Sequence, residues 1–122
     1  MPARLDIFPD QRLVLSTFTG MMDDDAILAH GPKIKAHPDF HPEYNEIVDF
    51  SGVTDVRISS TMLHKLARSE SIFSPESRHA VIAPGELTYQ IAHMYQIIAE
   101  RSRNLIVVRS LDEACRFVNA RL

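Results

Sequence analysis

The residues most suited to metal binding lie in one loop-like segment. Residues 37–43 read HPDFHPE and contain two histidines four positions apart, together with an aspartate and a glutamate. Imidazole and carboxylate groups can together bind zinc or a related ion. The prolines exclude a regular helix here, so the spacing does not by itself bring His37 and His41 together. We therefore expect a solvated loop with Phe40 packed inward, with no bound metal and no cofactor, and keep a site at His37 and His41 as the alternative.

A second group of residues could bind an organic ligand. Tyr89 and His93 are four positions apart, which makes them neighbours on one face of a helix. Together with Met94, and with Met62 from an earlier helix, they could line a cleft between helix and sheet. The more ordinary explanation, which we favour, is that Tyr89 and His93 pack their rings against the domain and keep their polar atoms in water.

Familiar catalytic and phosphate-binding patterns do not occur in the sequence. There is no GxGxxG, no P-loop, no HExxH and no GxSxG. The single cysteine, Cys115, has no motif around it that would make it a nucleophile. We predict no catalytic residues and expect that the protein is not an enzyme.

Composition and charge restrict the protein class. The chain has 122 residues, 45% hydrophobic and 24% charged, which predicts a single folded domain over residues 1–122. Its 13 basic and 16 acidic residues give a net charge of −3 without a basic stripe, which argues against nucleic-acid binding. A single cysteine excludes an intramolecular disulfide, and no apolar run is long enough for a signal peptide or a membrane span. We therefore expect a cytoplasmic protein.

The first half of the chain predicts a hairpin, a helix and a strand. Residues 5–8 and 13–20 alternate in hydrophobicity around a turn-like segment, which predicts a β-hairpin. Asp23, Asp24 and Asp25 are suited to a helix start, and Gly31-Pro32 should kink or end that helix. Residues 44–50 are expected to form a strand that ends at Ser51-Gly52.

The second half alternates helices with short apolar runs. Ser59 or Ser60 should cap a helix, and the runs at 79–84 and 105–108 are typical of strands buried on both faces of a parallel sheet. Residues 86–101 predict the longest helix, and Ser110 with Glu113 forms a capping box before the last one. The apolar stripe expected to be buried on the long helix consists of Leu87, Ile91, Met94, Ile98 and Ala99.

The predicted order is ββαβαβαβα. Strands that alternate with helices indicate an α/β fold with a mostly parallel mixed sheet and right-handed crossovers. The N-terminal strand would be an antiparallel edge. An edge strand at residues 5–8 makes a homodimer an open alternative.

Three segments resemble a known family. Ile47 to Thr54, IVDFSGVT, resembles the strand-and-turn signature of STAS domains. Residues 80–84 with the following helix, and residues 108–114, look like the SpoIIAA-like family of small bacterial proteins, which is grouped by fold with STAS and CRAL-TRIO domains. The likeness runs from about Leu13 to Phe117. It implies a SpoIIAA-like α/β fold and hardly bears on function.

The resemblance also implies one regulatory site. STAS anti-sigma-factor antagonists carry an Asp-Ser-Ser-Gly motif in which a kinase phosphorylates the first serine. The matching residues here are Ile58-Ser59-Ser60-Thr61, in which the aspartate and the glycine are replaced. Ser59 is therefore the candidate phosphorylation site, and the alternative is that it merely caps a helix.

Two functions follow as hypotheses. The first, which we favour from the sequence, is a non-enzymatic regulatory domain that binds an unknown protein partner. The alternative is a binding module for a small apolar or lipid-like ligand in a helix–sheet cleft, which rests on the fold link to CRAL-TRIO proteins. An exposed apolar patch would favour the first, and a pocket between helix and sheet would favour the second.

Overall fold

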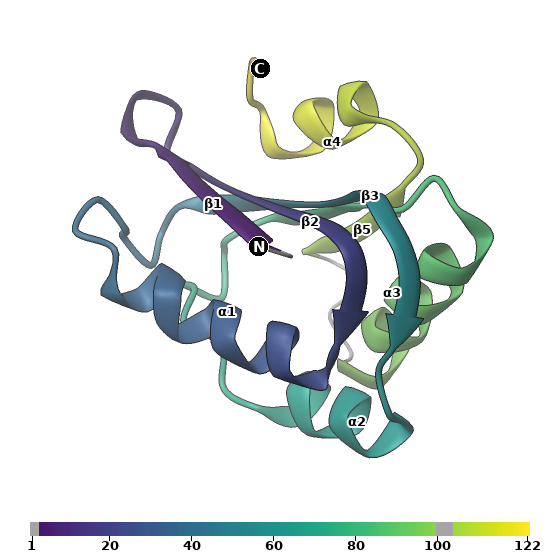
Figure 1. Ribbon diagram of the computed structural model, residues 1–122. Helices are drawn as coiled ribbons and strands as arrows, with labels where there is room; N and C mark the ends of the chain where they lie inside the picture. The colour runs from purple at the N-terminus through teal and green to yellow at the C-terminus, as the bar shows by residue number, and fades with distance from the viewer. Residues whose placement is uncertain (1–2, 100–103) are drawn as a thin grey trace.

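A five-stranded sheet organises the protein. The computed structural model describes residues 3–99 and 104–122. The sheet order is β1-β2-β3-β4-β5, and β1 lies at one edge (Figure 1). The elements in chain order are β1 (Ala3–Phe8), β2 (Leu13–Asp23), α1 (Asp24–Ala36), β3 (Asn45–Arg57), α2 (Ser60–Arg68), β4 (His79–Ile82), α3 (Glu86–Ala99), β5 (Leu105–Val108) and α4 (Leu111–Val118).

The predicted topology is confirmed. β1 pairs antiparallel with β2 through a tight connection in which Arg12 takes the left-handed conformation, with φ of 53°. The pairs β2–β3, β3–β4 and β4–β5 are all parallel. The chain is thus an α/β fold with a mixed sheet, as its alternating pattern indicated.

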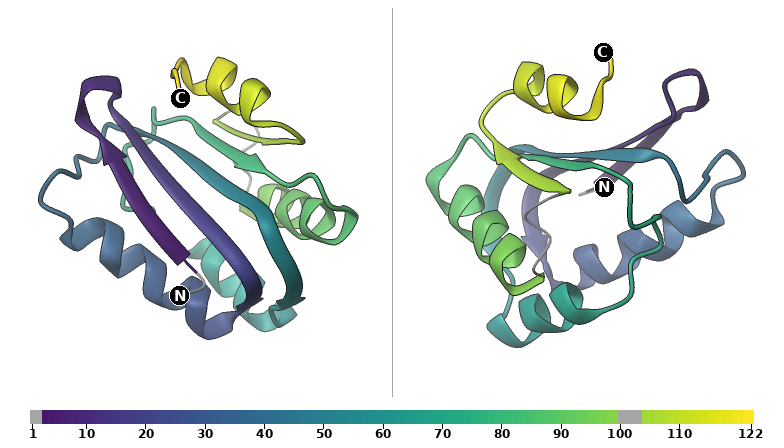
Figure 2. Two further views of the ribbon diagram at one scale, coloured as in Figure 1. Left: turned by 45° about the horizontal axis from the view of Figure 1, so that its top comes forward. Right: turned by 180° about the vertical axis from the view of Figure 1, so that it is seen from behind.

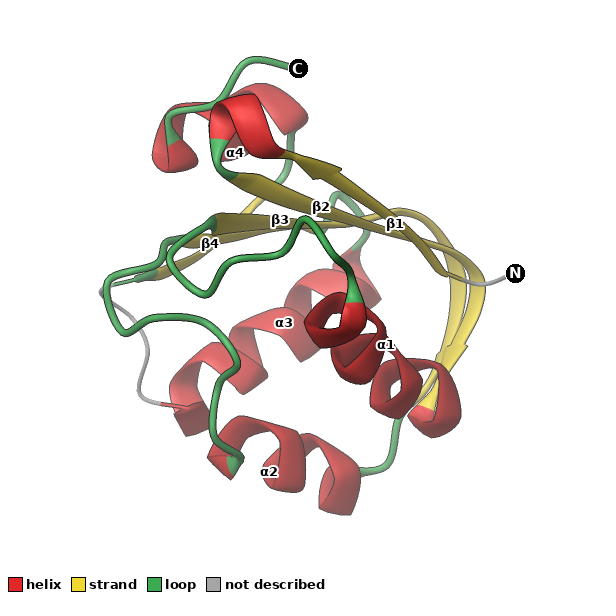
Figure 3. Cartoon of the chain, turned by 90° about the vertical axis from the view of Figure 1, so that its left-hand side faces the viewer, coloured by secondary structure: helices red, strands yellow, loops and turns green. Residues whose placement is uncertain are grey.

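Helices cover the two faces of the sheet unequally. α4 alone packs on one face, while α1, α2 and α3 lie on the other side (Figures 2 and 3). Because side chains alternate along a strand, successive residues point to opposite layers. Leu13, Ile47 and Ile82 belong to the core under α4. Phe18 and Phe50 belong to the core on the side of the other three helices.

The β2 and β3 strands are longer than predicted and curve towards the three-helix side (Figure 1). The prediction that β3 ends at Ser51-Gly52 is wrong, because the strand continues to Arg57. Gly52 instead marks a close approach. A Cβ there would lie 2.8 Å from Thr19 Cγ2, and the register between the strands shifts beside it. A glycine inside a strand often has this role, with a bulge that bends the strand.

The α1 helix also runs past its predicted end. It continues through Gly31-Pro32 to Ala36. A proline removes the hydrogen bond to the carbonyl four residues earlier, which here belongs to Leu28. Pro32 and Leu28 are both exposed, so the loss falls on the side of the helix that faces water.

The buried face of α3 differs from the predicted stripe. Leu87 and Met94 are 53% and 50% exposed, whereas Thr88 and Ala92 are buried. Ile97, at 64%, is exposed as well, so apolar residues occur on both sides of this helix. The stripe predicted from periodicity is therefore rotated around the helix by about one residue from the face that is buried. The predicted extension to Arg101 lies outside the described residues.

Side-chain caps fix where three helices begin. The Asp23 carboxylate accepts the N–H of Ala26, and the Ser59 hydroxyl accepts that of Met62. The Ser110 hydroxyl accepts the N–H of Glu113 and donates to its carboxylate, which confirms Ser110 as the predicted cap and shows one half of the predicted capping box. These starts agree with the sequence because capping is a local signal. None of the helices in the described part of the chain is long and apolar enough to cross a membrane.

Candidate functional site

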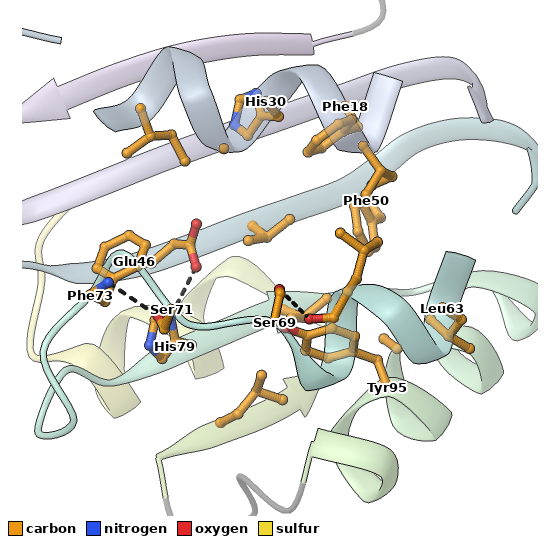
Figure 4. A pocket seen from close by; sticks show the side chains of 18 of the residues that line it. Phe18, His30, Glu46, Phe50, Leu63, Ser69, Ser71, Phe73, His79 and Tyr95 are labelled. Carbon is orange, nitrogen blue, oxygen red and sulfur yellow. Dashed lines mark hydrogen bonds and ion pairs between the residues drawn. The ribbon is translucent and has the colours of Figure 1, made fainter. Parts of the chain in front are cut away.

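A cavity of about 290 Å³ lies between the sheet and the three helices α1, α2 and α3. Most of its walls are apolar. Phe18 and Phe50 line it from the curved strands, Leu63 and Tyr95 from α2 and α3, and Phe73 from the segment before β4 (Figure 4). The cavity lies between helices and sheet, as in the alternative considered from the sequence, but its lining differs from the residues suggested there.

The segment between α2 and β4 borders the entrance to the cavity. Ser69, Glu70 and Ser71 are exposed and also line the cavity, so the cavity reaches solvent at this point. The Ser69 hydroxyl donates to the carbonyl of Leu66 and closes the end of α2. A ligand could enter here without displacing the sheet.

One buried polar pair joins α1 to β2 beside the cavity. His30 is 7% exposed and lines the cavity, and its Nε2 lies 2.6 Å from the hydroxyl of the fully buried Ser16. Burial lowers the pKa of His30 below its ordinary value of 6.5, Glu46 opposes this shift, and Lys33 adds to it. His30 is therefore neutral at pH 7.

A second polar pair lies in the sheet wall of the cavity. Glu46 and His79 are direct register partners on β3 and β4, and Glu46 Oε1 is 2.9 Å from His79 Nδ1. Their side chains are 14% and 4% exposed. The ring of Phe73 packs edge-on against His79, with centroids 4.9 Å apart. The carboxylate thus holds the imidazole in one orientation within an otherwise apolar wall.

The four residues predicted to bind a ligand do not line this cavity. Tyr89 and His93 stack on each other, with centroids 6.1 Å apart, and the Arg109 guanidinium lies 3.9 Å from the Tyr89 centroid. Met94 is half-exposed, and Met62 is half-buried outside the cavity lining.

Other residues of α2 and α3 line the cavity instead. The lining residues from these two helices are Leu63, Leu66, Ile91, Ala92 and Tyr95. Ile91 belongs to the stripe predicted from the sequence, whereas Ala92 and Tyr95 do not, because the exposed Leu87 and Met94 drew the predicted stripe towards the outer face of α3.

His37 and His41 each make a separate local contact. His37 Nδ1 accepts the backbone N–H of Asp39 within the loop, and the His41 ring packs on Tyr44, with centroids 5.2 Å apart. No cluster of three or more metal-binding side chains occurs among the residues that the structure describes. Phe40 packs edge-on against Phe73, in keeping with the inward position expected for it.

Ser59 joins the starts of two helices. Its backbone N–H and its hydroxyl donate to the two carboxylate oxygens of Asp24, at 3.0 and 3.1 Å. Its Oγ also caps α2 by accepting the N–H of Met62. Phosphorylation of the exposed Ser59 stays a prediction, and a phosphate there would face the Asp24 carboxylate.

Ser59→Asp is expected to lower the free energy of unfolding by about 1 kcal/mol at low salt. Aspartate can still cap α2, but it cannot donate to Asp24, and it places a second carboxylate beside it. Urea denaturation checks this value. The matched control is Ser59→Asp in an Asp24→Asn background, where the penalty should largely disappear. An equal penalty in both backgrounds would show that Asp24 does not interact with residue 59 in solution.

No protein-family model matches the sequence, and no curated protein matches it. Among solved structures, the chain is similar to an uncharacterized DUF3478-family protein from Shewanella loihica PV-4, which is described as having a SpoIIAA-like fold. The similarity covers 95% of this chain and 91% of that chain, with a TM-score of 0.61 and 15% sequence identity. At this identity the likeness shows the fold alone, and the predicted SpoIIAA-like fold is confirmed.

Proposed function

We propose that the protein is a non-enzymatic binding module for a small, mostly apolar molecule. The observation that carries the proposal is the cavity of about 290 Å³ between the sheet and α1–α3. Ligand sites are typically apolar cavities with a few placed polar groups, and this volume is at the small end of their range. His30, Glu46 and His79 are the placed polar groups. We further propose that the protein needs no cofactor and that it acts in the cytoplasm.

The packing of the two layers supports this assignment. Side chains are fully buried in both layers, Leu13 and Ile47 under α4 and Val14 and Met22 on the opposite face. The opposite face has three helices and still encloses unfilled space that reaches solvent beside Ser71. An unfilled volume in one layer reduces stability unless something occupies it.

Binding of the fluorescent apolar probe N-phenyl-1-naphthylamine tests the proposal. We expect the wild-type protein to enhance its fluorescence saturably, and Ala92→Phe to weaken binding at least about tenfold. Ala92 is 5% exposed and lines the cavity, so a phenyl ring there would occupy the ligand volume.

Met94→Phe is the matched control, because Met94 lies on the exposed side of the same helix and should leave binding unchanged. Circular dichroism confirms that each variant is folded, and Ala92→Leu replaces Ala92→Phe if the larger ring prevents folding. Equal binding by wild type and a folded Ala92 variant would refute a ligand site in this cavity.

A protein-interaction role is the second candidate. It is favoured by Leu87, Met94 and Ile97, which expose apolar side chains on the outer face of α3. Exposed apolar groups that gather on one helix are typical of contact surfaces. Absence of probe binding by the folded wild-type protein would favour this role over ligand binding.

A further inference from the structure

His30 leaves one ring nitrogen without a partner. Its Nε2 contacts Ser16 Oγ at 2.6 Å, whereas its Nδ1 is buried and has no hydrogen-bond partner. Across the part of the chain that the structure describes, this is the single buried side-chain nitrogen or oxygen in that condition. A buried polar atom without a partner destabilises a protein, and His30 lines the cavity, so a group bound in the cavity would supply the missing partner.

The contact with Ser16 determines which ring nitrogen carries the proton. Ser16 is fully buried, and its hydroxyl hydrogen needs an acceptor. Within the described residues His30 Nε2 is the group that Ser16 Oγ contacts, so the hydroxyl donates to Nε2. In a neutral imidazole the hydrogen then resides on Nδ1. The reverse arrangement would leave both the serine hydrogen and the Nδ1 lone pair unsatisfied.

The unpartnered atom is therefore an N–H donor, and it calls for an oxygen acceptor on the ligand. The Glu46 carboxylate lines the same cavity and is paired with His79. A ligand carboxylate would meet this like charge in apolar surroundings, where charges are poorly screened. A neutral carbonyl oxygen accepts the same hydrogen bond without that repulsion.

We propose that His30 Nδ1–H donates a hydrogen bond to a neutral carbonyl oxygen, so that the cavity selects a small apolar ketone, ester or amide. This inference rests on the proposed ligand-binding function and names the ligand class. The apolar walls hold the hydrocarbon part of the ligand, and His30 fixes the position of its carbonyl group.

A thermodynamic cycle tests the role of His30. The affinities of 2-decanone and decane are measured by displacement of N-phenyl-1-naphthylamine from the wild-type protein and from His30→Phe. The cycle cancels the difference in hydration between the two molecules. We expect His30→Phe to weaken 2-decanone about tenfold and to leave decane within about twofold. Equal changes for both molecules would refute the hydrogen bond.

Decanoate tests the preference for a neutral group. Glu46→Gln removes the like charge and should tighten decanoate relative to 2-decanone. No effect of Glu46→Gln on decanoate would overturn the exclusion of carboxylates. If decane and 2-decanone both fail to displace the probe, or the probe itself does not bind, the proposed ligand-binding function fails. If both bind but neither depends on His30, the inference fails alone.

Nitrogen-15 NMR of the histidine rings in the wild-type protein gives a second test. It needs no variant, so it does not depend on whether His30→Phe folds. We expect His30 to show the Nδ1–H tautomer, and the Nδ1 resonance to shift when 2-decanone binds but not when decane binds. An Nε2–H tautomer would overturn the inference. So would an Nδ1 resonance unchanged by bound 2-decanone, which would mean that water or no group at all is its partner.

Discussion

Ile47→Ala is expected to lower the free energy of unfolding by about 4 kcal/mol. Ile47 has no exposed surface and lies in the core under α4, in contact with a cluster that includes Ile82 and Val118. This layer is built on the central strands of the sheet and has little freedom to collapse around a lost side chain. Guanidinium denaturation gives the value. A loss of this size is a large fraction of the stability of a small domain.

The neighbouring residue provides the control, because it points to the other face. Val48 is half-buried and lines the cavity. Val48→Ala should cost only about 1 kcal/mol, since it enlarges a space that already reaches solvent. A penalty at Val48 as large as the one at Ile47 would mean that the cavity is closed and packed in solution.

The order of the elements could be predicted because its signals are local. Ser110 and Glu113 mark a helix start in any context, and the run from Ala80 to Ala83 is apolar over its whole length. Strands alternating with helices then leave few topologies. These features need no knowledge of distant contacts.

The lengths of elements could not be predicted, because distant contacts decide them. Gly52 looked like a strand end, yet the approach of Thr19 is what requires a glycine there. Pro32 looked like a helix end, yet the helix tolerates it on its exposed side. In both cases the residue marks a special position in the structure. However, it does not end the helix or strand, as glycine and proline often do.

The candidate site was missed for a related reason. His30 lies between Ile27 and Ile34 at helical spacing, so a histidine on an apolar face was visible in the sequence. Its partner Ser16 lies on β2, whereas His30 lies on α1. Likewise, Glu46 on β3 pairs with His79 on β4. Such pairs depend on the register of the strands and on the position of α1 against the sheet. The periodicity of the sequence does not determine either of these.

The free energy of unfolding is expected to fall as the pH is lowered below about 6.5, in part because of His30. Burial is the main cause of its lowered pKa, and the charged groups that act on it are Glu46 on β3, which opposes the shift, and Lys33 on α1, which reinforces it. Below the ordinary value of 6.5 the unfolded chain binds a proton that the folded chain does not, so protonation favours unfolding.

The lowered pKa of His30 determines the direction of this change in stability, and the single proton determines its largest slope. The His30 contribution is fully present above pH 6.5, is lost as the pH falls towards its lowered pKa, and does not change below that pKa. One proton limits the slope to about 1.4 kcal/mol per pH unit. The quantity to measure is the difference in urea stability between wild type and His30→Phe at each pH, because this difference isolates the contribution of His30. A smaller slope in the variant confirms that folded His30 is neutral, which is the state in which Nδ1–H can serve an uncharged oxygen acceptor. Identical slopes would mean that His30 binds protons equally well in the folded and unfolded chains, so that its burial does not lower its pKa.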